Sequence, residues 1–126
     1  MSTRHELGMK TRRKVLGDAH VDRAELAKTD FDAPFQSLIT EAAWGTVWAD
    51  GAISARDRSM LTLALLAATG NFDEIPMHIR ATANTGASKE DVIQSFLHVA
   101  IYAGVPRANH AIRLAKQTYA EMEEAT

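Results

Sequence analysis

Cysteine is absent from this sequence of 126 residues, and Phe, Trp and Tyr together make up only 6% of it. Without cysteine the chain can form no disulfide, no thiolate metal site and no thiol-based catalytic centre. Few aromatic residues beside abundant alanine favour helices over a β-sandwich. No apolar run approaches the roughly 20 residues that cross a bilayer, and the charged N-terminus lacks the apolar stretch of a secretory signal. We therefore expect a cytoplasmic protein.

An excess of either charge is lacking as well. A net charge of −2 and a charged fraction of 24% give no electrostatic reason to expect a nucleic acid or an anionic membrane as partner. The hydrophobic fraction of 46% is ordinary for a globular protein. The length suits one domain with a substantial core. We expect a single domain over residues 1–126.

Apolar residues recur at helical spacing through most of the chain, and no segment alternates as a strand does. Helices are predicted within residues 6–18, 33–50, 53–70, 71–86, 88–104 and 107–124, and a loop or broken helix within 17–34. Ser54 with Asp57, and Ser88 with Asp91, have the spacing of a capping box. The pattern indicates an all-α protein of about six helices packed as antiparallel hairpins.

Two of these helices are apolar on more than one side. Helix 53–70 is apolar nearly all round after Arg58, which predicts the most buried helix of the fold. Helix 33–50, which we expect Gly51 to close, carries two apolar stripes, one of Phe35, Leu38, Ile39, Ala42 and Thr46 and another of Trp44, Val47 and Trp48. Both stripes must be covered, within the domain or by another subunit. We therefore expect a homo-oligomer.

A candidate acid–base pair lies in the stretch NFDEIPMHIRATANTG, residues 71–86. Glu74 and His78 are four residues apart and share one helix face. A surface pair of this kind contributes only about 0.2–0.5 kcal/mol, and that structural interpretation stays open. The predicted helix start favours a functional one, because the macrodipole there disfavours a protonated imidazole. A neutral histidine beside a carboxylate can exchange a proton near pH 7.

Other candidate residues have structural alternatives too. His98 and Tyr102, also four apart on an apolar helix, are expected in the core. The histidines lack the spacing of a zinc site, so we expect no metal. Arg58 is either a surface residue or a buried anion clamp. Glu41 lies within one turn of Trp44, where a carboxylate is costly unless it is paired.

Six blocks of the sequence resemble the carboxymuconolactone decarboxylase family: RRKVLGDAHVDRA, ITEAAWGTVW, RDRSMLTLALLAATG, EIPMHIRA, NTGASKEDV and HVAIYAGVPRANHA. Each block alone is weak evidence, but the six occur in the family's order and span nearly the whole chain. The resemblance implies an AhpD-like helical bundle that assembles through its apolar helices into a trimer or hexamer.

A related peroxidase branch of this superfamily has a Cys-x-x-Cys-x-x-x-His helix start. At the matching positions the chain has Asn71, Glu74 and His78, and Ser59 stands in place of that branch's proton-relay glutamate. A thiol peroxidase is therefore nearly excluded. Asp50 stands where the decarboxylases usually have Arg, and Gln94 where Glu is common, which leaves the choice of lactone open.

The resemblance implies cofactor-free decarboxylation of 4-carboxymuconolactone to β-ketoadipate enol-lactone, a step of protocatechuate catabolism in the β-ketoadipate pathway. His78 is implied to be catalytic, oriented by Glu74 or Glu41. The residues implied to bind substrate are Arg58, Arg12, Arg13, Trp44 and Met77. A decarboxylase or isomerase of a related lactone and a non-enzymatic helical assembly module stay open as alternatives.

Overall fold

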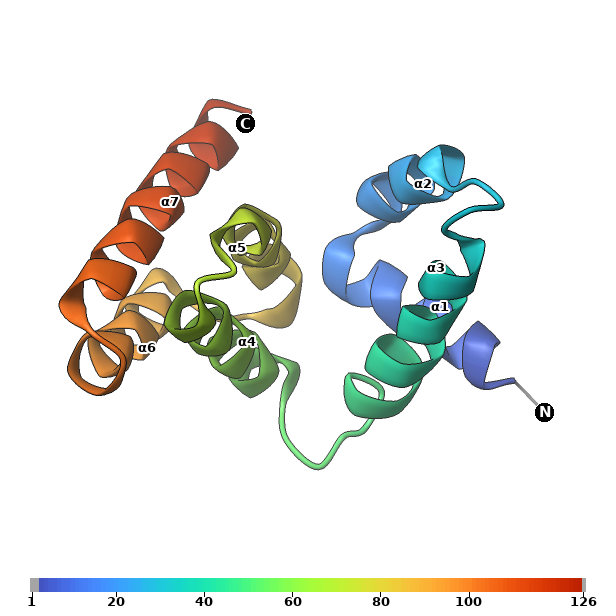
Figure 1. Cartoon of the computed structure of the whole chain (residues 1–126), viewed down its shortest axis with the longest axis horizontal. Coiled ribbons are helices and arrows are strands. Elements are labelled where there is room, and N and C mark those ends of the chain that lie inside the picture. The colour runs from blue at the N-terminus through green and yellow to red at the C-terminus, as the bar shows by residue number, and fades with distance from the viewer. Residues whose placement is uncertain (1–2, 126) are drawn as a thin grey trace. The chain divides into compact units, whose positions relative to one another are not determined.

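The structure, a computed structural model, describes residues 3–125. Helices make up most of this range, and it contains no strand (Figure 1). The predicted all-α fold is thereby confirmed. The chain divides into two compact units, Met1–Ala55 and Arg56–Thr126. The single domain expected over the whole length stays a prediction.

Four helical segments build the first unit: α1 (Arg4–Leu16), α2 (Asp18–Ala27), α3 (Ala33–Ile39) and the π-helix η1 (Thr40–Val47). The stretch predicted as a loop or broken helix thus contains a regular helix, α2. Gly17 separates it from α1 at φ +90°, a backbone conformation that glycine adopts without strain. The predicted helix 33–50 is present as α3 and η1 in succession.

The change from α3 to η1 is a change in backbone hydrogen bonding. The N–H of Trp48 donates to the carbonyl of Ala43, five residues back, at 2.9 Å, which is the π-helical pattern. The segment then ends at Val47, before the predicted boundary at 50. Gly51 lies in a turn beyond it, so the prediction that Gly51 closes this helix is wrong.

Close backbone contact joins α1 and η1. A Cβ at Gly8 would overlap the carbonyl oxygen of Thr40, and one at Gly45 would lie 2.5 Å from that of Arg4. Both positions therefore require glycine. The buried face of α1 consists of Gly8, Arg12 and Val15, which places one charged side chain among small and apolar ones.

The second unit contains α4 (Ala55–Thr69), the 3-10 turn η2 (Phe72–Glu74), α5 (Ile75–Thr85), α6 (Lys89–Tyr102) and α7 (Val105–Glu124). Helix α7 packs against both α5 and α6. The buried core residues are Leu63, Ala67, Ile75, Ile79, Val92, Phe96, Val99, Ala108, Ala111 and Ala115. The expectation that α4 is the most buried helix is wrong, because Leu61 and Leu65 are 54% and 62% exposed.

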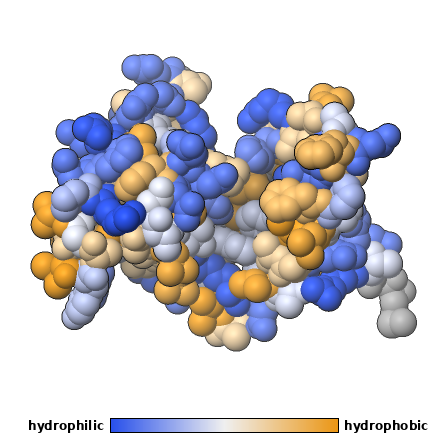
Figure 2. Space-filling model, viewed as in Figure 1, coloured by the Kyte–Doolittle hydropathy of each residue, from blue (hydrophilic) through white to orange (hydrophobic). Residues whose placement is uncertain are grey.

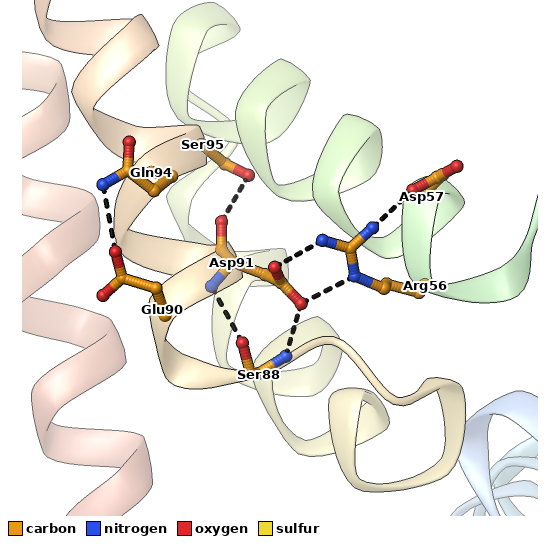
Figure 3. Close-up of polar contacts among 7 residues, drawn as sticks. All are labelled: Arg56, Asp57, Ser88, Glu90, Asp91, Gln94 and Ser95. Carbon is orange, nitrogen blue, oxygen red and sulfur yellow. Dashed lines mark hydrogen bonds and ion pairs between the residues drawn. The ribbon is translucent and has the colours of Figure 1, made fainter.

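Polar contacts tie the N-terminal ends of α4 and α6 together (Figure 3). The Asp91 carboxylate accepts from the Ser88 N–H while the Ser88 hydroxyl accepts from the Asp91 N–H, so the predicted capping box is confirmed. The same carboxylate accepts from Arg56 Nε at 2.8 Å and Nη2 at 2.6 Å. These bonds, the arginine's above all, hold the pKa of Asp91 well below its usual range.

Candidate functional site

The start of α5 carries the candidate acid–base pair, but the helix begins later than predicted. Asn71 is the N-cap of the short turn η2, and Glu74 is the N-cap of α5. Pro76 therefore lies in the first turn of α5, where the amide it lacks would have no intrahelical partner. His78 follows within the same turn.

Glu74 and His78 lie in different environments. Glu74 is exposed, whereas His78 is only 8% exposed. The interpretation as an ordinary surface pair is therefore wrong for the histidine. Met77, the residue before it, is half-buried. An imidazole enclosed at a helix start, one turn after a residue whose carboxylate is exposed to water, suits a group that exchanges a proton.

A hydroxyl contact links α4 to α5. His78, Thr82 and Thr85 follow one another at spacings of four and three residues, so they share one face of that helix. Ser59 of α4 is fully buried, and its hydroxyl lies 2.7 Å from that of Thr85. Arg58, the neighbour of Ser59, is half-buried. The second unit thus carries His78 and Arg58 on two helices that a partly buried pair of hydroxyl groups joins.

The other predicted site residues belong to the first unit. Glu41 of η1 is exposed, and its backbone carbonyl accepts from Arg4 Nε and Thr46 Oγ1. The expected cost of a carboxylate beside Trp44 does not arise, because the Glu41 side chain stays in water. Trp44 itself is buried, with its ring 5.3 Å from that of Trp48.

The two neighbouring arginines of α1 differ. Arg13 is half-buried, and its Nη1 lies 3.1 Å from Asp18 and 2.9 Å from Asp22, which raises its pKa. Arg12 is 5% exposed, and its ion pair with Glu25 is 3.7 Å long. Two short ion pairs therefore hold Arg13 against α2. The buried Arg12 has a single ion pair, which is longer than either of them.

A groove between α4 and α6 was not predicted. It consists of two adjoining cavities of about 340 and 310 Å³ that share Leu61, Ala64 and His98. His98 is exposed and stacks on Tyr102, with ring centroids 6.0 Å apart. The expectation that both residues lie in the core is wrong. The buried residues of α6 lie on the side of the helix that faces the core. Gln94, His98 and Tyr102 recur every four residues on the opposite side, and this spacing could have indicated the groove.

Metal-binding side chains do not gather in this part of the molecule or elsewhere in residues 3–125. No group of three or more His, Asp or Glu side chains there is placed to hold an ion. Nor does any helix in this range combine the length and the apolar character that crossing a bilayer requires.

Comparison with known proteins connects this helical arrangement to a family. The family model described as "Carboxymuconolactone decarboxylase family" matches residues 33–117, which is more than half of the chain and runs from α3 into α7. The chain belongs to the carboxymuconolactone decarboxylase family. The resemblance seen in the six sequence blocks is thereby confirmed. The matched residues include Glu41, Trp44, Arg58, Glu74 and His78, whereas Arg12 and Arg13 precede them.

Several named proteins are similar to all or part of the chain. The 4-carboxymuconolactone decarboxylase of Acinetobacter baylyi is 37% identical over 119 residues, covering 94% of this chain and 89% of that protein. The nitrosuccinic acid decarboxylase of Metarhizium robertsii is 36% identical over 115 residues, 91% of this chain and 80% of that one. A 4-carboxymuconolactone decarboxylase sequence from Pseudomonas putida is 52% identical over 42 residues, 33% of this chain and 88% of its own length.

Proposed function

We propose that this chain is a carboxy-lyase that converts 4-carboxymuconolactone into β-ketoadipate enol-lactone and CO2 without a cofactor, as a step of protocatechuate catabolism in the cytoplasm. The observation that carries the proposal is the 37% identity, over 94% of the chain, to a protein named for this reaction. The absence of cysteine from the sequence agrees with a mechanism that needs no thiol.

The substrate can supply its own electron sink. The carboxylate that leaves is attached to a ring carbon that is conjugated, through the ring double bond, with the lactone carbonyl. When the C–C bond to this carboxylate breaks, its electron pair moves into the ring and onto the carbonyl oxygen as a dienolate. Protonation of the carbon beside the carbonyl then completes the enol-lactone. The protein has to stabilise the oxyanion and deliver one proton.

His78 is the residue we assign to these two tasks. An imidazole enclosed at the start of α5 can donate a hydrogen bond to the developing oxyanion or deliver the proton to carbon. The exposed carboxylate of Glu74 precedes it by one turn and is our first choice for orienting the ring. Glu41, which is exposed on η1, is the alternative.

The remaining side chains are assigned to the substrate's two ends. We assign Arg58 to the acetate group, because guanidinium groups bind carboxylates through charge-assisted hydrogen bonds. Arg12 and Arg13 of the first unit stay candidates for binding substrate. Trp44 and Met77 are apolar surfaces suited to exclude water from the leaving carboxylate, and a carboxylate that loses its hydration loses CO2 more readily.

Purified protein and freshly generated 4-carboxymuconolactone test the proposal directly. We expect stoichiometric CO2 and enol-lactone, at the same rate after extensive dialysis against EDTA. A substrate consumed no faster than in buffer would contradict the function. A rate lost on dialysis and restored by a divalent ion would contradict the cofactor-free mechanism alone.

Nitrosuccinate is the second candidate substrate, because the relative named for its decarboxylation is 36% identical over 91% of the chain. Its nitro group is attached to the carbon that carries one carboxylate, so it can accept the electron pair as the lactone does. The same CO2 assay with nitrosuccinate separates the two: we expect a kcat/KM at least about tenfold lower than for the lactone, roughly 1.4 kcal/mol of transition-state binding. The reverse order would reassign the substrate.

We also propose a homo-oligomer, a trimer or hexamer. Space-filling colouring shows apolar patches on the surface of both units (Figure 2). Phe35 and Leu38 of the first predicted stripe are 58% and 61% exposed, and Ile101 and Tyr102 of α6 are 78% and 84% exposed. Apolar side chains in such number on one small chain indicate association surfaces.

A further inference from the structure

A small cavity between α6 and α7 is lined by none of the residues assigned to the reaction. Its volume is about 140 Å³, and its apolar lining consists of Val92, Ile93, Phe96, Ile112 and Ala115. On each helix the lining residues follow one another at spacings of three and four, so each helix turns one face to the cavity. All of these residues belong to the second unit.

The floor of this cavity is the hydrophobic core itself. Val92, Phe96 and Ala115 are at most 5% exposed and are members of the core cluster. Protein interiors are close-packed and contain few voids larger than a water molecule. Apolar cavities of about 150 Å³ that were engineered into a protein core stay dry and bind benzene. The α6–α7 cavity therefore has the size and the lining to accept an apolar group as large as one ring.

Two exposed lysines border the cavity, and the charge of the first is matched within the unit. Lys89 Nζ lies 2.7 Å from Glu123 Oε1 and 5.0 Å from the centroid of the Tyr119 ring, which also lines the cavity. The hydrogen bond to Glu123 is the main reason why the pKa of Lys89 is raised. Lys89 is thus held by its neighbours.

The second lysine, Lys116, is different. It lines the cavity next to Ala115, and within residues 3–125 its ammonium group has no hydrogen bond and no ion pair. Among the described residues, none that lines the cavity is acidic. An apolar floor of one ring's size thus lies beside a single positive charge without a counter-ion.

We propose that the α6–α7 cavity binds a small monocarboxylate, with an apolar ring of about benzene's size on the core residues and the carboxylate on Lys116. An ammonium group suits this task, because it is a point charge that binds a carboxylate in many orientations. A dicarboxylate is unsuited, since its second charge would lose water against the apolar lining. The inference goes beyond the proposed function, whose substrate has two carboxylates.

Benzoate is the probe, with calorimetry and thermal unfolding of the full chain as readouts. It should bind and raise Tm, whereas acetate at equal ionic strength should not. Lys116→Met should weaken benzoate binding about two- to fivefold, because the ion pair that it removes is exposed to solvent, and Lys116→Arg should restore the affinity. Benzyl alcohol, which has the ring without the charge, should bind the wild type and Lys116→Met equally. Lys10→Met, at an exposed lysine of α1, should bind benzoate like the wild type.

Ala115→Leu tests the cavity itself. Because Ala115 is buried at its floor, the added carbons of leucine occupy the space that the ring would fill. We expect benzoate and benzyl alcohol to bind at least tenfold more weakly to this variant. If Ala115→Leu does not fold, the comparison of the two ligands on Lys116→Met decides.

Three outcomes would overturn the proposal. In the first, benzoate stabilises the wild type no more than acetate does. In the second, both Lys116→Met and Ala115→Leu bind benzoate like the wild type. In the third, His78→Gln abolishes benzoate binding, which would mean that benzoate occupies the proposed active site. A wild type that binds benzoate through Lys116 but releases no CO2 from the lactone would refute the function and leave the cavity site in place.

Discussion

Two histidines on neighbouring helices, His78 in α5 and His98 in α6, have opposite environments. Each belongs to an i, i+4 pair, and the sequence alone predicts the first near the surface and the second in the core. The structure reverses the order: His78 is 8% exposed and His98 is on the wall of an open groove. A single helical period shows which residues share a face, but not which face the neighbouring helices cover.

This reversal changes how His78 is tested. His78→Ala leaves a cavity and should lower stability as well as rate, so His78→Gln is the cleaner variant. We expect His78→Gln to lower kcat/KM by roughly 10² to 10⁴, the span of one acid–base or oxyanion group. Glu74→Gln should lower kcat/KM by a smaller factor, because glutamine keeps a hydrogen-bonding group at this position. Steady-state kinetics with circular dichroism as a fold check measure both.

His98→Ala is the control for that experiment. Because His98 is exposed, its removal should change the free energy of unfolding by no more than about 0.5 kcal/mol. A folded His98→Ala protein that is inactive, beside an active His78→Gln protein, would move the catalytic group from α5 to the groove between α4 and α6.

At the scale of helices, backbone contact between α1 and η1 holds the first unit together. The π-helical segment places the carbonyl of Thr40 against Gly8, and Gly45 against Arg4. A π-helical turn is uncommon and costs backbone energy, and such turns occur frequently at functional sites. In this chain it carries Glu41 and Trp44, two of the predicted site residues.

Gly8→Ala tests this contact. Alanine would improve helix propensity by about 1 kcal/mol, but its Cβ overlaps the Thr40 carbonyl, and overpacking of this kind costs about 1–3 kcal/mol or more. We expect a net loss of stability in urea unfolding. Gly51→Ala is the matched control, because no atom lies within 4 Å of its added Cβ. Equal stability of the two variants would show that α1 and η1 do not approach so closely.

The contact between Arg56 and Asp91 makes a prediction about pH. The pKa of Asp91 is lower in the folded chain than its unfolded value of about 3.9. The carboxylate therefore stabilises the fold above about pH 4, and this stabilisation is lost as the pH falls toward the folded pKa. Arg56→Met should lower Tm clearly at pH 6, and the difference from the wild type should shrink steadily between pH 4 and pH 2.

Arg80→Met is the control for this pH series. Arg80 makes an ion pair of 2.7 Å with Glu121 in which both side chains are about half exposed, and exposed pairs of this kind contribute little. At pH 6 the Tm of Arg80→Met should therefore lie closer to that of the wild type than the Tm of Arg56→Met does. If the difference in Tm between Arg56→Met and the wild type is the same at pH 6 and pH 2, Asp91 stabilises the fold through its capping bonds alone.

At the scale of the whole molecule, the proposed oligomer depends on apolar residues that one chain leaves exposed. Leu38→Glu places a charge in the first stripe of α3 and should reduce the mass measured by light scattering, at micromolar concentration, to that of a smaller assembly or a monomer. Leu26→Glu, at a leucine of α2 that is 87% exposed and lies outside both predicted stripes, should leave the mass unchanged. A monomeric wild type would refute the oligomer.

Much of the architecture follows from local chemistry. The all-α class comes from composition and helical spacing, and the capping box at Ser88 and Asp91 from a spacing that satisfies two helix-end donors at once. The family follows from the order of the sequence blocks, and its model matches residues 33–117. The absence of thiol chemistry needs only the absence of cysteine.

Environment, in contrast, depends on tertiary structure. Periodicity cannot distinguish Arg12 from Arg13, because both are arginines of one basic helix; packing against η1 and α2 buries the first and pairs the second with two aspartates. Periodicity also cannot show that His78 is enclosed or that two leucines of α4 are exposed to solvent. Sequence by itself determined the all-α class and the family, since these depend on neighbours along the chain. Burial, and with it the cost of an unpaired charge, was decided by neighbours in space.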